Sequence, residues 1–294
     1  MSDAPPRLFD RALWLARRAR RALPRPEARF LHQAAADAVA ERLDTVARDF
    51  PQTLLAWPGA PDWAEMLGAH PKIGRLTIAE PRADEILDAA PEAFDLAVLG
   101  LTLHWVDDPV GALIQMRRAL RPDGLLIACG FGGETLAELR AAFAEAEAEV
   151  EGGLSPRVSP MGEIRALGGL AQRAGLALPV VDSDRLDVTY AHPLALMRDL
   201  RAMGEANAQH ARRRAPLRRA TLARACEIYA ERFPAPPNAP DEAPRIRATF
   251  EIVTLTGWAP GPDQPQPKRP GSATTRLADA LGVPELRAGE KAGK

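Results

Sequence analysis

Short apolar runs alternate with longer amphipathic stretches along the first half of the chain. The apolar runs, at residues 53–57, 75–80, 94–101 and 125–129, have the length and composition expected of buried strands. The stretches between the later runs carry apolar residues at helical spacing, with Pro or Gly near their ends. Strands and helices that alternate in this way predict a parallel sheet with helices on both faces.

The second half of the chain is predicted to be mainly helical until one last strand. Helices are expected at 134–151 and 160–174, followed by a short strand near 178–182. The arginine-rich segment 193–233 has a strongly helical pattern, and residues 249–258 form a strand rich in β-branched residues. The pattern therefore predicts a helical insert, 193–233, immediately before the final strand.

The two ends of the chain differ from its middle. Two helices, about 6–23 and 27–49, open the chain, and a tail rich in Pro and Gly closes it, with a short helical piece at 275–281. We expect three parts: an N-terminal helical extension (1–50), a main α/β domain (51–260) and a largely disordered tail (261–294).

Composition narrows the class of protein. The chain has 294 residues, 38 Lys and Arg against 39 Asp and Glu, and a net charge of −1, so charge favours neither a nucleic-acid binder nor an anion trap. Its two cysteines, Cys129 and Cys226, have no metal-ligand spacing and cannot build a disulfide framework, so we predict no metal site and a cytoplasmic setting. No apolar run reaches the roughly 18 residues of a transmembrane helix. Residues 7–29 hold eight arginines and resemble a transit peptide, but a solvated basic helix is the favoured interpretation.

Several motifs together resemble the class I S-adenosyl-L-methionine-dependent methyltransferases. They are Phe94-Asp95-Leu96, Leu103-His104-Trp105-Val106-Asp107-Asp108, Leu120-Arg121-Pro122-Asp123-Gly124 and Phe131-Gly132-Gly133-Glu134-Thr135-Leu136. The chain is most similar to the branch that contains bacterial relatives of mitochondrial complex I assembly factor 5, itself related to malonyl-carrier-protein methyltransferases. Residues 200–207 and 255–260 resemble that branch too. The resemblance implies an α/β, Rossmann-like methyltransferase fold with an antiparallel last strand, N-terminal helices, and the helical insert as a lid over the substrate mouth.

The resemblance also implies S-adenosyl-L-methionine as the cofactor, bound between Gly59, Glu80 and Gly100. A glycine in the turn after the first strand lets the backbone approach a cofactor closely. Glu80 ends the second strand, about 20 residues after that turn, where an acidic residue can bind ribose hydroxyls; the alternative is a solvated carboxylate. Leu99, Gly100 and Leu101 would line the pocket through backbone contacts.

Two departures from the family pattern predict that cofactor binding is weak or lost. The first turn, Ala56-Trp57-Pro58-Gly59-Ala60-Pro61, lacks the usual carboxylate and has a single glycine, although Asp62 could supply a charge nearby. Between Glu80 and Asp95 there is little room for the helix and third strand that normally build the adenine side.

His104 and Trp105 are the candidate catalytic residues. They follow the strand 94–101, at the end of an open α/β sheet where ligands bind. His104 could act as a general base or line the substrate mouth, and Trp105 could stack on the adenine or the substrate. The alternative is that Trp105 fills the core and His104 is a surface or capping residue.

An arginine cluster at 198–224 holds eight arginines against Asp199 and Glu205. It is either a surface for a protein substrate or respiratory-chain subunit, or a solvated helix face. We therefore carry two main hypotheses from the resemblance: an S-adenosyl-L-methionine-dependent methyltransferase-like enzyme that acts on a protein, including an arginine side chain, in complex I assembly; or a catalytically inactive escort protein. A nucleic-acid methyltransferase would need a larger basic face than this chain offers.

Overall fold

The computed structural model describes residues 7–21, 26–60, 62–237, 243–262, 264 and 275–283. Residues 1–261 belong to one compact unit and residues 262–294 to a second. The second unit contains the helix α9 (Leu277–Leu281), which confirms the helix expected at 275–281. Most of the tail predicted to be disordered lies outside the described residues, as does Pro61 of the first turn.

The first unit is built from one sheet and the helices that cover it. Its strands are β1 (Phe50–Ala56), β2 (Ile73–Ala79), β3 (Phe94–Leu99), β4 (Leu120–Phe131), β5 (Ala177–Tyr190) and β6 (Ile246–Trp258). Its α-helices are α1 (Arg11–Arg21), α2 (Phe30–Thr45), α3 (Trp63–Gly68), α4 (Pro109–Ala119), α5 (Ala137–Glu151), α6 (Ile164–Arg173), α7 (Pro193–Met203) and α8 (Arg219–Arg232), with short 3-10 helices η1 (Pro26–Arg29) and η2 (Leu103–Trp105).

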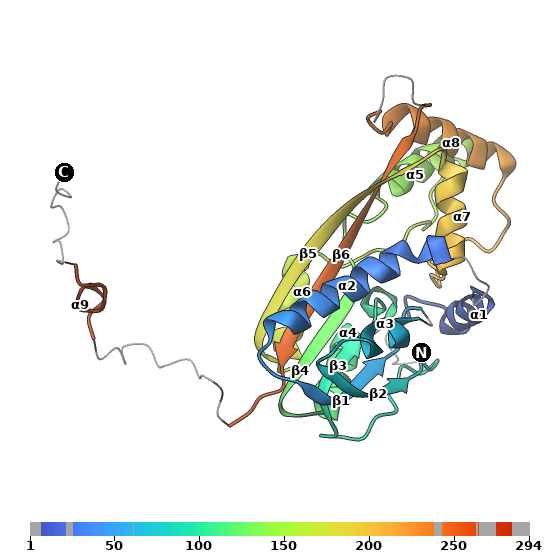
Figure 1. Ribbon diagram of the computed structural model, residues 1–294. Helices are drawn as coiled ribbons and strands as arrows, with labels where there is room; N and C mark the ends of the chain where they lie inside the picture. The colour runs from blue at the N-terminus through green and yellow to red at the C-terminus, as the bar shows by residue number, and fades with distance from the viewer. Residues whose placement is uncertain are drawn as a thin grey trace, which may run out of the picture. The chain divides into compact units, whose positions relative to one another are not determined.

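The strand order, β2-β1-β3-β4-β6-β5, is that of a Rossmann-like methyltransferase sheet without its third strand. β1 pairs in parallel with β2 and β3, β3 pairs in parallel with β4, and β6 is antiparallel to both β4 and β5 (Figure 1). Residues 80–93 contain neither helix nor strand, which leaves β2 at the edge. The predicted α/β fold, its antiparallel last strand and the shortened connection are confirmed.

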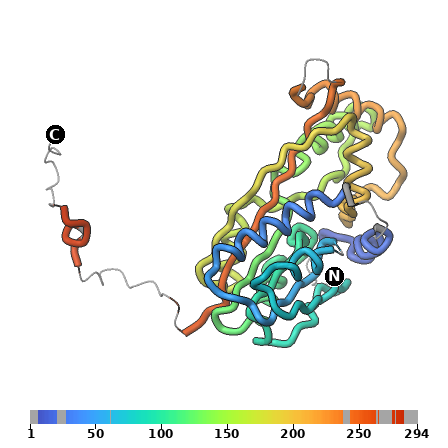
Figure 2. The backbone as a smooth tube through the Cα atoms, viewed as in Figure 1, coloured from blue at the N-terminus to red at the C-terminus, as the bar shows by residue number. Residues whose placement is uncertain are grey.

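The inner strands β1, β3 and β4 are mostly buried on both faces, so they read as apolar runs. In β3, Leu96 and Val98 join the core on the side of α2, α3, α5, α7 and α8, whereas Ala97 and Leu99 join the core on the side of α4 and α6. The alternation follows from the two-residue repeat of a strand. Figure 2 shows α2 crossing the sheet beside β6.

The last two strands are longer than their apolar pattern indicates. β5 was expected over 178–182 but spans 14 residues and pairs with β6 as far as Tyr190. Polar residues at exposed positions, among them Asp184 and Asp187, hide this strand from a search for apolar runs. The paired β5 and β6 extend well beyond the other strands, towards α5, α7 and α8 (Figure 1).

The prediction of a continuously helical insert over 193–233 is wrong in its middle. Residues 204–218, between α7 and α8, are not helical. Gly204 ends α7 with a φ of 81°, a conformation that glycine adopts without strain. The N-terminal helices are not separate from this domain, since α2 contributes Leu31, Val39 and Leu43 to the core. Among the described residues, no helix is both long and apolar enough to span a bilayer.

Candidate functional site

The structure brings four of the five predicted cofactor-binding residues together at the ends of β1 and β3. The Gly59 N–H donates a 2.6 Å hydrogen bond to the carbonyl oxygen of Gly100. A Cβ added at Gly59 would lie 2.9 Å from that oxygen and 3.0 Å from the Leu101 carbonyl oxygen. Leu99 and Leu101 are fully buried beside this contact. The turn after β1 therefore packs directly on the end of β3, and only glycine fits at position 59.

Two side chains from the N-terminal half cover this contact. Trp63, at the start of α3, is fully buried, and its ring would lie 3.1 Å from a Cβ added at Gly100. The Trp63 Nε1 donates to His32 Nδ1 at 3.5 Å, and His32 Cε1 would lie 3.0 Å from a Cβ at Gly59. The two glycines of the predicted cofactor site are therefore in contact with the rings of Trp63 and His32.

The two acidic residues near this turn, Glu80 and Asp62, both lie beside arginines. The side chain of Glu80 is 71% exposed and lies 3.6 Å from Arg18, and Asp62 pairs with Arg29 at 3.1 Å. Ala56, where relatives carry a carboxylate, is fully buried. Glu80 thus faces an arginine, whereas Gly59 and Gly100 are in direct contact with each other.

His104 lies in η2, directly after β3, and its side chain is only 1% exposed. The interpretation of His104 as a surface residue is therefore wrong. Its Nδ1 accepts a hydrogen bond from the Phe131 N–H at 3.2 Å, and its Nε2 is 3.1 Å from Glu205 Oε2. Because Nδ1 accepts, we assign the proton to Nε2, which then donates to the Glu205 carboxylate.

Trp105 combines the two roles that the sequence left open. Its ring is buried against Phe9, with centroids 5.1 Å apart, and against Trp14, with centroids 6.3 Å apart. Its Nε1 donates a 2.8 Å hydrogen bond to the same oxygen of Glu205 that His104 contacts. Trp105 is both a core residue and a wall of the cavity described below.

Glu205 is a candidate site residue that the sequence did not single out. It directly follows Gly204 at the end of α7, and its backbone N–H donates to the Leu200 carbonyl at 2.8 Å, as in the common helix ending with a left-handed glycine. This ending directs the side chain inward, where it is 8% exposed and its Oε1 lies 3.9 Å from His32 Nε2. The available signal was its place in residues 200–207, a segment that resembles the family.

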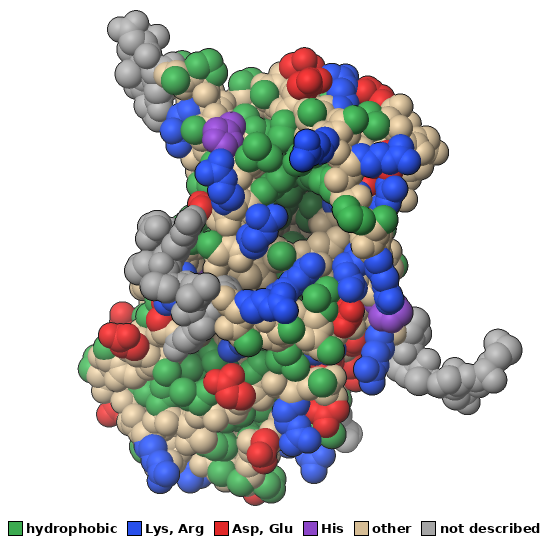
Figure 3. Space-filling view, turned by 90° about the vertical axis from the view of Figure 1, so that its right-hand side faces the viewer, with side chains coloured by type: hydrophobic (Ala, Val, Ile, Leu, Met, Phe, Trp, Pro, Cys, Tyr) green, Lys and Arg blue, Asp and Glu red, His purple; other side chains and the backbone are tan. Residues whose placement is uncertain are grey.

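Glu205 and Trp105 lie on the wall of a cavity of about 150 Å³. The other walls come from the end of β4, the start of α5, α7, β6 and residues 157–161, with the aromatic rings of Phe131 and Phe250 among them. Figure 3 views the molecule from the side that carries α1 and α7; that face is hollowed, with hydrophobic side chains in the hollow and Lys and Arg around it.

Arg157, which also lines the cavity, is paired with a buried acid. Its Nε donates to Glu147 Oε1 at 2.7 Å, and Ser155 donates to the same carboxylate. Burial alone would raise the pKa of Glu147, but the hydrogen bonds from Ser155 and Arg157 outweigh it and lower this pKa. Glu147 therefore stays ionised and fixes Arg157 at the edge of the cavity.

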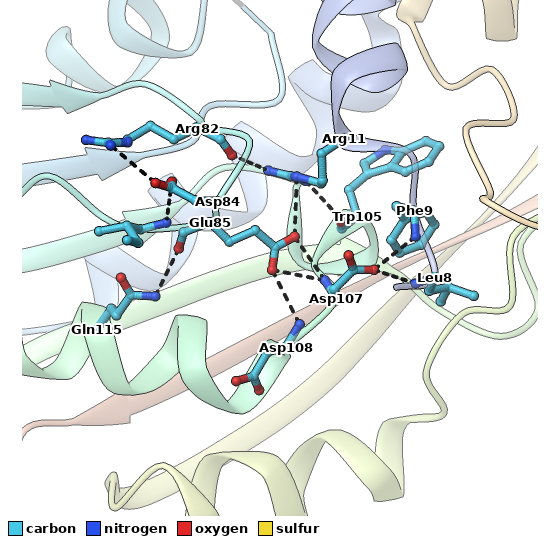
Figure 4. Close-up of polar contacts among 11 residues, drawn as sticks. Leu8, Phe9, Arg11, Arg82, Asp84, Glu85, Trp105, Asp107, Asp108 and Gln115 are labelled. Carbon is cyan, nitrogen blue, oxygen red and sulfur yellow. Dashed lines mark hydrogen bonds and ion pairs between the residues drawn. The ribbon is translucent and has the colours of Figure 1, made fainter. Parts of the chain in front are cut away.

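Hydrogen bonds and an ion pair hold the N-terminal segment, residues 7–21, against the loop that carries Trp105 (Figure 4). Arg11 donates to the Trp105 carbonyl at 2.9 Å and lies 3.3 Å from Glu85 Oε1. The Asp107 carboxylate accepts hydrogen bonds from the N–H groups of Leu8 and Phe9, both at 2.9 Å. Burial lowers the pKa of Arg11, and the nearby carboxylates of Glu85 and Asp107 oppose this shift.

Both cysteines are free thiols. Burial raises the pKa of Cys129 to about 11, and it also raises the pKa of Cys226. Thiols of this kind are protonated and unreactive at neutral pH, as expected for packing residues. Within the described part of the chain, no three His, Cys, Asp or Glu side chains are grouped as metal ligands.

Comparison with known proteins gives a consistent family. Residues 56–128 match the methyltransferase domain family. The chain is 34% identical over 309 residues to the arginine-hydroxylase NDUFAF5, mitochondrial, of Mus musculus, an alignment that covers 97% of this chain and 87% of that protein. It is 33% identical over 298 residues to the Homo sapiens protein of the same name, with 92% and 83% covered.

A second group of relatives aligns over less of the chain. The malonyl-acyl-carrier-protein O-methyltransferase of Halorhodospira halophila is 34% identical over 170 residues, which covers 58% of this chain and 54% of that protein. The alignments with the NDUFAF5 proteins, in contrast, span most of both chains. Together with the sheet topology and the methyltransferase domain, they show that this chain belongs to the NDUFAF5 family of methyltransferase-fold proteins.

Proposed function

We propose that this protein binds the side chain of an arginine in a partner protein and holds it for modification beside Glu205. The observation that carries this proposal is a carboxylate, only 8% exposed, on the wall of a largely apolar cavity. A buried carboxylate favours a cationic partner, and the planar guanidinium matches its geometry with two parallel hydrogen bonds. The name of the relatives, arginine-hydroxylase, supports the same substrate side chain.

The size and lining of the cavity also favour a single side chain. Pockets that enclose whole small molecules usually measure about 300–1,000 Å³, whereas this cavity measures about 150 Å³. The rings of Trp105, Phe131 and Phe250 offer flat faces on which a guanidinium can stack. The cavity is therefore suited to one arm of a larger molecule.

His104 and Trp105 act in this proposal as positioning residues. Both contact one oxygen of Glu205, at 3.1 Å and 2.8 Å, and an ionised carboxylate can accept about four hydrogen bonds. They fix the carboxylate in one orientation, so that a guanidinium meets a rigid acceptor and not a mobile side chain.

The partner is proposed from the family resemblance, and the setting from the two cysteines without a disulfide framework. We propose a subunit of respiratory complex I as the partner, and the cytoplasm as the place of action. The contact between Gly59 and Gly100 supports weak or absent binding of S-adenosyl-L-methionine, and therefore favours hydroxylation over methylation of the arginine. Hydroxylation needs dioxygen and a two-electron reductant, which together replace one C–H hydrogen of the arginine by a hydroxyl group and release the second oxygen atom as water. The arginine cluster at 198–224 remains a proposed surface for that partner.

The test compares complex I subunits from cells that lack the protein with subunits from cells that carry the wild type, Glu205→Gln, or the control Glu65→Gln. Glu65 is exposed on α3, away from the cavity lining. Peptide mass spectrometry should find an arginine that gains one oxygen atom with the wild type and the control, but not with Glu205→Gln. An added methyl group instead would show a methyltransferase.

The second candidate is a catalytically inactive escort, which the contact between Gly59 and Gly100 favours. It predicts that wild-type cells carry no modified arginine, although the protein still co-purifies with a complex I subunit. Unchanged arginine modification in the Glu205→Gln cells would overturn the proposed role of the cavity.

A further inference from the structure

A polar groove adjoins the cavity beside Glu205. It measures about 810 Å³, and Val158 and Met161 line both the groove and the cavity. The groove walls carry carboxylates from Glu134, Glu163 and Glu251 together with Arg140 and Arg165. A ligand could therefore enter the cavity with one arm while its remainder lies in the groove.

Gln209 lines the groove and carries an amide without a protein partner. The residue is 3% exposed, and its Nε2 has no hydrogen-bond partner among the described residues. Its backbone is well held, because its N–H donates to Asn207 Oδ1 at 2.9 Å and its carbonyl accepts from Arg212. A buried donor without an acceptor is costly, so a native one calls for an explanation.

Ser159 repeats this pattern on the cavity side. It is 6% exposed and lines the cavity, and its Oγ has no hydrogen-bond partner within the described part of the chain. Ser159 lies between Val158 and Met161 in sequence, the two residues shared by the cavity and the groove. Its hydroxyl rotates freely, and the last torsion of Gln209 is soft, so both groups can turn towards a ligand.

We propose that the groove binds an extended polypeptide segment on either side of the arginine that enters the cavity. This inference rests on the proposed function. Extended backbone offers unpaired carbonyl and N–H groups, whereas the backbone of a helix satisfies its own. Gln209 Nε2 donates to a peptide carbonyl in the groove, and Ser159 Oγ bonds the backbone next to the arginine. The mixed charges of the groove disfavour a polyanion and suit a peptide.

The experiment uses two probes and the full chain in calorimetric titration. One probe is acetyl-arginine methylamide, and the other is a blocked peptide with alanines on both sides of the arginine. Each backbone hydrogen bond contributes roughly 2- to 10-fold in affinity. The longer probe should bind at least about 10-fold more tightly, and Gln209→Met and Ser159→Ala should each remove roughly 2- to 10-fold of that gain.

A stability measurement separates this role from a structural one. Because the amide of Gln209 lacks a protein acceptor, Gln209→Met should leave the melting temperature unchanged or raise it. Gln172→Met, at an exposed position of α6, is the matched control and should change neither probe's binding. A lower melting temperature with equal losses for both probes would make Gln209 structural and overturn the proposal.

The two probes also separate the groove from the cavity. If the short probe binds and loses binding in Glu205→Gln, but the longer probe binds no better, the groove proposal fails while the proposed function stands. If the short probe does not bind the wild type, or binds Glu205→Gln equally well, the proposed function fails and the groove proposal with it.

Discussion

The carboxylate of Glu205 is held by two ring N–H groups, one from His104 and one from Trp105. The same tryptophan supplies buried area to the packing of Phe9 and Trp14. Trp105 therefore stabilises the protein in two ways. Its ring contributes hydrophobic burial, which depends on ring size. Its Nε1 contributes a hydrogen bond to a charged group.

Substitutions of Trp105 separate these effects. Trp105→Ala should lower the free energy of unfolding by about 3–5 kcal/mol, as large aromatic truncations do. Trp105→Phe keeps a ring but loses the bond to Glu205, so it should cost less, about 1.5–3 kcal/mol. Urea unfolding gives both values. A Trp105→Phe value within about 0.5 kcal/mol of the wild type would show that the bond to Glu205 contributes little.

Two neighbouring arginines of the cluster at 198–224 provide a second test at this scale. Arg213 forms an ion pair with Glu151, whose side chain is 7% exposed and also accepts from Thr221 Oγ1 at 2.6 Å. Arg214 is exposed. Arg213→Glu places two carboxylates together and should destabilise the protein by about 1–3 kcal/mol, whereas Arg214→Glu should stay within about 0.5 kcal/mol.

Thermal melts of the two variants give the comparison. The result bears on the cluster as a whole, because Arg212 is also paired, with Asp10 at 3.0 Å. If both variants changed the melting temperature equally little, Arg213 would have no structural role. The whole cluster would then be available to bind a partner. If Arg213→Glu is less stable than Arg214→Glu, as expected, a partner surface is limited to the arginines that do not form buried ion pairs.

At the scale of elements, the N-terminal segment, residues 7–21, packs against the loop that carries Trp105. It crosses from α1 to the loop after β3, and Arg11 connects it to Trp105 and Glu85 (Figure 4). The Arg11 side chain is 3% exposed and that of Glu85 is 14% exposed. Removal of one partner from such a pair leaves the other charge uncompensated.

Arg11→Met should therefore loosen the segment and cost up to about 3–5 kcal/mol. Hydrogen exchange should rise in residues 7–21 and around Trp105, with less change in the sheet. The double variant Arg11→Met with Glu85→Gln should recover part of the loss, since it leaves no unpaired charge. Arg7→Met, at an exposed position, is the control. Unchanged exchange in residues 7–21 would show that apolar packing alone holds the segment.

At the scale of the whole molecule, the turn after β1 packs against the end of β3. Gly59 bonds directly to Gly100, Trp63 covers Gly100, and the connection between β2 and β3 contains no helix or strand. The open cavity lies on the other side of η2, between β4, α5, α7 and β6. A second cavity, of about 130 Å³, lies beside Leu103, His104 and Gly130, at the ends of β3 and β4.

Calorimetric titration with S-adenosylhomocysteine should accordingly show weak or no binding. A restored family turn, Ala56→Asp with Pro58→Gly, should not improve it, because Ala56 is fully buried in the apolar core and a carboxylate there is costly. The double variant should instead be less stable than the wild type. Tight binding by the unmodified chain would show that the turn and the end of β3 separate in solution, and would favour the methyltransferase hypothesis.

Much of the fold was predictable because it depends on local pattern. The runs that became β1, β3 and β4 are buried on both faces and therefore read as apolar whatever their partners are. The missing third strand was predictable because too few residues lie between Glu80 and Asp95 to form both a helix and a strand. The full length of β5 was not, because cross-strand pairing with β6 determines it and its exposed side chains are polar.

The sequence by itself determined the class of sheet and the place of His104 and Trp105 after β3, since each depends on residues that are neighbours along the chain. The antiparallel last strand was expected only from the resemblance of several motifs to a known family. The tertiary structure alone decided that Glu205 lies against these two residues, about 100 positions away, and that Gly59 meets Gly100. A charged side chain such as Glu205 becomes a candidate site residue only once its burial and its hydrogen-bond partners are known. Both properties arise only when distant segments pack together, so no local pattern could show them.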